Sequence, residues 1–128
     1  MTELDDETIA FAHRMFDLAR TGGTEELLGN VTAGLPADLT NDKGDTLLIL
    51  AAYHDHVETV AGLLDKGADP NRINDRGQSA LSAAVFRQNA GTVKALLAAG
   101  ADPDGGTPSA VATAEFFKLP EMAALLRQ

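Results

Sequence analysis

The amino-acid sequence predicts an all-α solenoid of about four helix-turn-helix repeats, with short β-hairpin-like loops and modified terminal repeats. Two observations predict this fold class. Residues 41–48 and 74–81 align position by position at a spacing of 33, and the 128-residue chain is just under four such periods long. The composition, 45% hydrophobic and 23% charged, is that of a folded domain. A fixed period of this length is typical of stacked repeats.

The same spacing continues through the whole repeat unit. The Gly-Ala-Asp-Pro stretch at residues 67–70 recurs 33 positions later at 100–103, and Gly34 stands 33 positions before Gly67 as part of a weaker leading copy. Each such unit stacks only on its neighbours in a solenoid. We therefore expect a single domain, 1–128, whose repeats cover approximately 5–40, 41–73, 74–104 and 105–128.

The last repeat is shorter, and its alignment with the preceding repeat has two solutions. Matching residues 104–106 (Asp-Gly-Gly) to 75–77 (Asp-Arg-Gly) gives a spacing of 29, whereas matching 107–108 (Thr-Pro) to 79–80 (Ser-Ala) gives 28. The sequence leaves both open. In either case the missing residues fall just after Pro103.

The leading repeat is expected to begin with a long helix, from about Asp6 to Arg20. Acidic residues at its start suit the positive end of the helix dipole; these are Asp5, Asp6 and Glu7. The apolar residues available for the core are Ile9, Phe11, Met15, Phe16 and Leu18. Thr24 is expected to cap the next helix, because its hydroxyl can accept a hydrogen bond from a first-turn amide.

The first helix of each later repeat is expected to start after a capping hydroxyl. Thr46 and Ser79 each precede an apolar run, as N-caps do. In the last repeat, Thr107 is the expected cap, with Pro108 at the first helical position. These residues mark where each hairpin-like loop ends and a helix begins.

The second helix of each repeat carries an apolar stripe at helical spacing. In the second repeat the stripe consists of Val57, Val60, Leu63 and Leu64. Gly67 and Gly100 follow the paired leucines by three residues, where a left-handed residue can end a helix. The final helix is expected to start at Pro120 and end at Arg127.

Together these positions resemble the ankyrin repeat. In the second repeat the matching positions are Gly44, Thr46, Leu48, Ala51, Ala52, His56, Val60, Leu63, Leu64, Gly67, Ala68, Asp69 and Asn71. In the third they are Gly77, Ser79, Leu81, Ala84, Val93, Leu96, Leu97, Gly100, Ala101 and Asp102. The chain departs from the pattern at Leu47 and Ala80, where proline is usual, and at Asp55, where glycine is usual. The chain also resembles the small stand-alone ankyrin proteins of bacteria, whose last repeat carries the same Gly-Thr-Pro-Ser-Ala stretch as residues 106–110 here.

The resemblance implies a concave face, built from the hairpin tips and the inward ends of the first helices, that binds other proteins. Carrying this face over position by position gives the candidate protein-binding residues Arg20, Asp42, Lys43, Asp45, Tyr53, His54, Asp75, Arg76, Gln78, Phe86 and Arg87.

Among these residues, Arg20, Tyr53 and Phe86 share one repeat slot at intervals of 33. Aromatic residues and arginine dominate interface energetics, so the two rings are candidates for partner contact. The alternative is that both rings pack against the next repeat. The aspartates Asp42, Asp45 and Asp75 likewise have an alternative role as turn formers.

Catalysis, cofactors and metals are not expected. The chain has no cysteine, and the one metal-like spacing, residues 54–56 (His-Asp-His), does not direct two ligands to one point. His56 is expected to pack in a loop, and His13 to lie on the surface. Two Gly-Gly-Thr stretches, at 22–24 and 105–107, lack the Gly-Lys-Ser/Thr of a nucleotide-binding loop, and we interpret them as turns.

The net charge of −9 disfavours nucleic acid and anionic membranes, and favours a basic or neutral partner. No apolar run is long enough to span a bilayer, and the acidic N-terminus does not resemble a secretion signal. We therefore expect a cytoplasmic, monomeric, non-catalytic module that binds a partner protein. The alternative is a dedicated regulator or protective partner of one enzyme, for example in a bacterial stress response.

Overall fold

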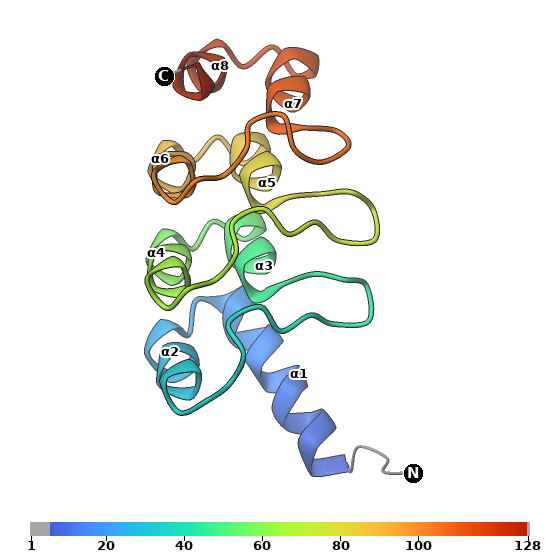
Figure 1. The fold of residues 1–128 in the computed structure, drawn as a ribbon, viewed down its shortest axis with the longest axis vertical. Helices are drawn as coiled ribbons and strands as arrows, with labels where there is room; N and C mark the ends of the chain where they lie inside the picture. The colour runs from blue at the N-terminus through green and yellow to red at the C-terminus, as the bar shows by residue number, and fades with distance from the viewer. Residues whose placement is uncertain (1–5, 128) are drawn as a thin grey trace.

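A computed structural model describes residues 6–127 as two columns of helices joined by loops that project to one side (Figure 1). Over these residues there are eight helices: α1 (Asp6–Thr21), α2 (Thr24–Thr32), α3 (Leu47–Tyr53), α4 (Val57–Asp65), α5 (Ala80–Phe86), α6 (Ala90–Ala98), α7 (Ala110–Phe116) and α8 (Pro120–Leu126). The loops carry isolated antiparallel bridges, such as Ile73 with Ser79, in place of strands. The predicted all-α stack is confirmed.

The core lies between the two columns and runs through the whole stack. Helices α1, α3, α5 and α7 form one column and α2, α4, α6 and α8 the other, with each pair resting on the pair before it (Figure 1). Fully buried leucines mark successive levels of this core; they are Leu27, Leu48, Leu63, Leu81 and Leu96. Each repeat therefore buries its apolar face against a neighbour, as the 33-residue period predicts.

The predicted caps of the two inner first helices are confirmed. The Thr46 hydroxyl accepts a hydrogen bond from the amide of Ile49 at 3.0 Å. The Ser79 hydroxyl accepts one from Ser82, whose own hydroxyl accepts from the Ser79 amide and so completes a capping box.

The predicted start of the last repeat is wrong. The N-cap of α7 is Ser109, which accepts from the amide of Ala112 at 3.0 Å, and Pro108 precedes the helix. The physical reason is that two residues separate Gly106 from this cap, whereas one separates Gly77 from Ser79. The spacing that relates α5 and α6 to α7 and α8 is therefore 30, and neither 29 nor 28.

Three further expectations are corrected. Thr24 is the first residue of α2 and makes no capping bond; its hydroxyl instead lies 2.6 Å from that of Thr59 in α4. Ile9 and Phe11 are exposed because the N-terminal half of α1 extends beyond α2 (Figure 1). Val57, the first residue of α4, is exposed at 39%. Asp5, expected at the start of α1, lies outside the described residues.

Backbone hydrogen bonds join the loops of successive repeats. The amide of Asp75 donates to the Lys43 carbonyl at 3.0 Å, and the amide of Thr107 donates to the Gly77 carbonyl at 2.8 Å. His56 adds a side-chain bridge, because its Nε2 lies 2.8 Å from the Arg20 carbonyl of the preceding repeat. The expected loop-packing role of His56 is confirmed, and the loops are held in a fixed relative position.

The outer end of the stack differs from its interior at one position. Ala52 in α3 and Val85 in α5 are fully buried by the next repeat, and Glu115 occupies the equivalent position in α7, where it is exposed. A charged residue is what a repeat requires when its outer side meets water.

Gly77→Ala is expected to lower the free energy of unfolding by about 2 kcal/mol, and Gly67→Ala by about 1 kcal/mol. Both glycines have positive φ, 78° and 95°, which an alanine adopts only with strain. A Cβ at residue 77 would also lie 2.8 Å from the carbonyl oxygen of Thr107, whereas one at residue 67 would meet nothing within 4 Å. Urea unfolding of the two variants measures the difference; equal losses would show that the loop contact is unimportant.

Candidate functional site

Three aromatic rings lie side by side in three successive repeats. Tyr53 is the last residue of α3, Phe86 is the last residue of α5, and Phe117 directly follows α7. Each ring is about half exposed, at 44%, 44% and 48%. We call these three residues the aromatic row.

The rings of the row contact one another across the repeats. The centroids of Tyr53 and Phe86 are 6.4 Å apart with planes only 4° from parallel, and those of Phe86 and Phe117 are 5.3 Å apart at 67°. Phe116, 79% exposed, packs edge-on against Phe117. Both alternatives for Tyr53 and Phe86 therefore describe part of the arrangement: the rings touch the next repeat and still present nearly half of their surface to solvent.

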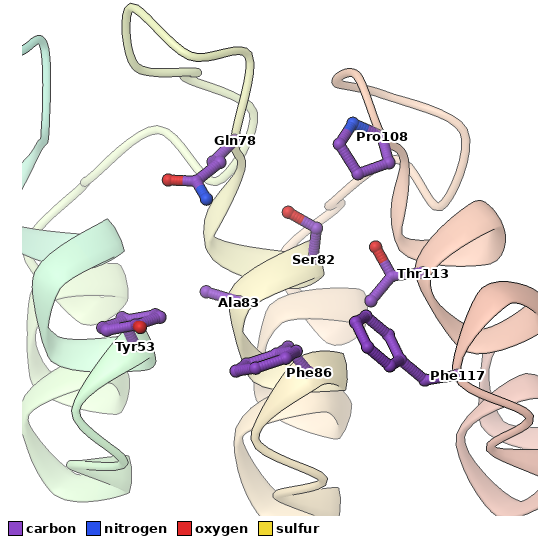
Figure 2. Close-up of a pocket in the computed structure, with 8 residues that line it drawn as sticks. All are labelled: Tyr53, Gln78, Ser82, Ala83, Phe86, Pro108, Thr113 and Phe117. Atoms are coloured by element: carbon purple, nitrogen blue, oxygen red, sulfur yellow. The ribbon is translucent and has the colours of Figure 1, made fainter.

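A small cavity of about 240 Å³ opens beside the row (Figure 2). Its other lining residues are Gln78, Ser82, Ala83, Pro108 and Thr113. Among these, the hydroxyl of Ser82 donates to the Ser79 carbonyl and that of Thr113 donates to the Ser109 carbonyl. The cavity is smaller than the roughly 300–1,000 Å³ of pockets for small-molecule ligands, so its size suits a single side chain better.

Basic residues lie along the side of the row where the first helices end. Arg20 is the next-to-last residue of α1, and His54 and Arg87 directly follow α3 and α5 as their C-caps. The pKa of His54 is lowered, first because the ring is partly buried, and then because His56, Arg20 and Arg87 place positive charge near it. We call Arg20, His54 and Arg87 the basic edge.

The hairpin candidates fall into two groups. Asp42, Lys43, Asp75 and Arg76 are exposed at the loop tips, where a partner could reach them. Their turns are stabilised by the preceding asparagines: the Asn74 side-chain oxygen accepts from the amides of Arg76 and Gln78, and Asn41 does the same one repeat earlier.

Asp45 and Gln78 are engaged inside the protein. Asp45 is only 7% exposed, and its carboxylate accepts a hydrogen bond from the Asn74 side-chain amide at 2.7 Å. The same amide donates to the side-chain oxygen of half-buried Gln78 at 2.9 Å. Asp45 therefore joins two repeats and does not belong to the accessible face.

The histidines and the acid of residues 54–56 point to different partners. His54 packs edge-on against Tyr53, Asp55 accepts a hydrogen bond from Asn89, and His56 lies against the Arg20 carbonyl. Within residues 6–127 no group of three His, Cys, Asp or Glu side chains is arranged to hold a metal ion. His13 is exposed on α1, as expected.

Sequence reasoning missed Phe117 and Pro108. With the spacings of 29 or 28, Phe117 falls opposite a polar residue of the preceding turn, so it did not join Tyr53 and Phe86. The match of Ser109-Ala110 with Ser79-Ala80 at a spacing of 30 places Phe116 opposite Phe86 and Phe117 opposite Arg87, so periodicity alone does not add Phe117 to the row.

Comparison with known proteins gives two results. A family model described as ankyrin repeats, in three copies, matches residues 16–106. A curated protein of Pseudomonas aeruginosa, named as an ankyrin repeat protein, is similar: it is 53% identical over 58 residues, which are 45% of this chain and 34% of that protein. The match thus covers about a third of the relative's length.

No helix among the described residues is long and apolar enough to cross a membrane.

Proposed function

Because the chain belongs to the ankyrin repeat family, whose repeats are generally protein–protein interaction modules, we propose that it is a non-catalytic module that binds a partner protein. The partner is held by the aromatic row, the basic edge and the exposed hairpin tips, which together make up the face that family members use. The cytoplasmic location, the monomeric state and the single-domain division expected from the sequence stay predictions.

The observation that carries this proposal is the exposed aromatic row beside a small cavity. Tyr53, Phe86 and Phe117 keep nearly half of their surface in solvent and contact one another across three repeats. Aromatic side chains that lie next to a pocket provide most of the binding energy in many interfaces. A continuous exposed apolar surface of this kind is typical of an interaction site.

The rigidity of the stack supports the same function. Successive loops are joined by backbone hydrogen bonds, and Asn74 links Asp45 to Gln78 beneath them. The side chains of the binding face are therefore held in position before a partner arrives. Such preorganisation reduces the entropy lost on binding, and so raises affinity for a given contact area.

The double variant Tyr53→Ala, Phe86→Ala is expected to fold nearly as well as the parent protein and to lose its native partner. Both rings are 44% exposed, so their removal leaves the core intact. Affinity purification from the native host, with mass spectrometry to identify the captured protein, measures the loss. Recovery of one stoichiometric enzyme whose activity changes on binding would favour the narrower role of a dedicated regulator.

The matched control is the double variant Phe11→Ala, Val57→Ala, which removes similarly exposed apolar side chains outside the row. It should retain the partner. Thermal unfolding of both variants confirms that each remains folded. If the Tyr53→Ala, Phe86→Ala protein captures the same partner in the same amount as the parent, this face is not the binding face.

A further inference from the structure

We infer that a second copy of this chain docks at the end of the stack, with Phe116 of each copy in a hollow of the other and Glu115 of each copy against Lys118 of the other. This self-association goes beyond the proposed binding of a partner protein. It competes with the monomeric state expected from the sequence, and one measurement decides between the two. It is carried by the exposure of Phe116, the hollow beside this ring and the order of the charges around it.

Phe116 is a ring that the stack leaves uncovered. At the spacing of 30 it stands in the slot of Phe86, and Phe86 is contacted by Phe117 of the next repeat just as Tyr53 is contacted by Phe86. Tyr53 and Phe86 are each 44% exposed. Phe116 is 79% exposed, because α7 is the last helix of its column among the described residues (Figure 1). A second copy would supply the ring that a further repeat would otherwise provide.

A hollow of about 430 Å³ lies next to Phe116 on α7. Its lining residues are Pro108, Ala112, Thr113, Phe116 and Phe117. Four of these side chains are apolar, and the hydroxyl of Thr113 donates to the Ser109 carbonyl. The hollow is therefore suited to an aromatic side chain. Because the projecting ring and the hollow belong to one patch, two copies can fill each other's hollow in a two-fold contact.

The charges that flank the two rings are self-complementary. Residues 115–118 read Glu-Phe-Phe-Lys, and all four are exposed. A two-fold axis that passes between Phe116 and Phe117 reverses this segment, so that Glu115 of each copy faces Lys118 of the other. Neither Glu115 nor Lys118 belongs to an ion pair within residues 6–127. An acid and a base on either side of two rings therefore match a second copy of the same segment.

The backbone of this segment is fixed before association. The amide of Lys118 donates to the Glu115 carbonyl at 3.2 Å, and the amide of Leu119 donates to the Ala114 carbonyl at 2.8 Å. The order of the four side chains is thus set by the end of α7 and the turn that follows it. Little backbone entropy is lost when two such segments meet.

The last repeat is also a region where two copies can approach without net repulsion. Residues 110–127 contain two acidic and two basic residues, whereas the whole chain has a net charge of −9. Two copies that met through the acidic remainder of the chain would repel each other. Charge therefore favours this end of the stack as the place where copies meet.

The mass of the protein as a function of concentration tests the inference. The contact involves few residues and is smaller than a standard interface, so we expect a dissociation constant on the order of 100 µM. In sedimentation velocity, the average mass should rise with concentration from that of one chain toward that of two. Backbone amide shifts that change on dilution should lie in residues 108–118.

Phe116→Ala should weaken self-association about tenfold, because each dimer loses two ring contacts. The variant should remain folded, since the ring is 79% exposed in the single copy. The matched control is Phe11→Ala, which removes an exposed ring on α1 at the other end of the stack (Figure 1). It should associate as the parent does, and thermal unfolding confirms that both variants are folded.

Two charge reversals test the orientation of the copies. Glu115→Lys places lysine against Lys118 twice in each dimer, and Lys118→Glu places glutamate against Glu115 twice. Each variant alone should associate about fivefold more weakly than the parent at low salt. An equimolar mixture of the two variants should recover the parent's association, because the lysines of one copy then face the glutamates of the other.

Three results would overturn the inference: an average mass that stays that of one chain at every concentration, a Phe116→Ala protein that associates as tightly as the parent, or a mixture of the charge variants that associates no better than either alone. Partner capture is measured separately with Tyr53→Ala, Phe86→Ala. A failure of self-association therefore leaves the proposed function in place.

Discussion

Leu81→Ala is expected to lower the free energy of unfolding by about 3 kcal/mol, because it leaves a cavity that the stack cannot close. Leu81 lies in α5, is only 1% exposed and belongs to the central core. Helix α5 packs on α3 on one side and α7 on the other, so the cavity weakens both interfaces of the third repeat. In a solenoid, stability comes mainly from the contacts between neighbours. Urea unfolding followed by far-ultraviolet circular dichroism measures the loss.

The matched control is Leu125→Ala in α8, where the same leucine side chain is only partly buried and lies in the terminal repeat. We expect a loss of about 1 kcal/mol there, because less apolar surface leaves water on folding. A loss at Leu81 no larger than that at Leu125 would show that the central repeat does not couple the two ends of the stack.

Asn74→Ala is expected to have the second largest effect, also about 3 kcal/mol. The Asn74 side chain is 5% exposed and makes four hydrogen bonds, two within its own turn and one each to the side chains of Asp45 and Gln78. Removing it breaks the turn and leaves the carboxylate of Asp45 buried without a donor, and an unpaired buried charge is costly. Urea unfolding again measures the change.

Asn41→Ala provides the control, because Asn41 makes the same two turn bonds and no bond to an earlier repeat. It should cost about 1 kcal/mol, so the difference isolates the link between repeats. Adding Asp45→Asn to Asn74→Ala removes the buried charge and should recover part of the loss. If Asn41→Ala and Asn74→Ala cost the same, the bond to Asp45 does not stabilise the stack.

The overall fold could be predicted from the sequence because its determinants are local and repeated. Thr46 and Ser79 cap helices through bonds that span only three residues, and Gly67 ends a helix through its own backbone conformation. Because the same residue types recur in two copies 33 residues apart, these determinants can be told apart from residues that match by chance. The start of α7 was not predictable in this way, because the shortened loop leaves no second copy with the same length.

The candidate site was predictable only in part, for a related reason. Tyr53 and Phe86 share a repeat slot, so periodicity brings them together, whereas Phe117 stands in the slot of Arg87 and meets Phe86 only in the folded stack. Asp45 was placed on the surface because its local sequence is that of a turn. Its burial comes from Asn74, which is 29 residues away in sequence and adjacent only in the folded stack.

The charge of a binding face is likewise not a property of composition. Most of the acids lie in turns, in first turns of helices and at loop tips, where they compensate local dipoles or stand beside basic residues. Arg87 and His54 come together only because α3 and α5 stack with their ends aligned. The net charge of the chain therefore does not describe the local arrangement of Arg87 and His54.

The exposed Glu115 also bears on the size to which such a stack can grow. Head-to-tail stacking of copies through α7 would have no symmetry that closes it, so it would lead to open filaments. Every added unit, whether it came from the same chain or from another, would have to pair or bury the Glu115 carboxylate where α5 buries Val85. Covering Glu115 without a partner for its charge would therefore weaken such a contact.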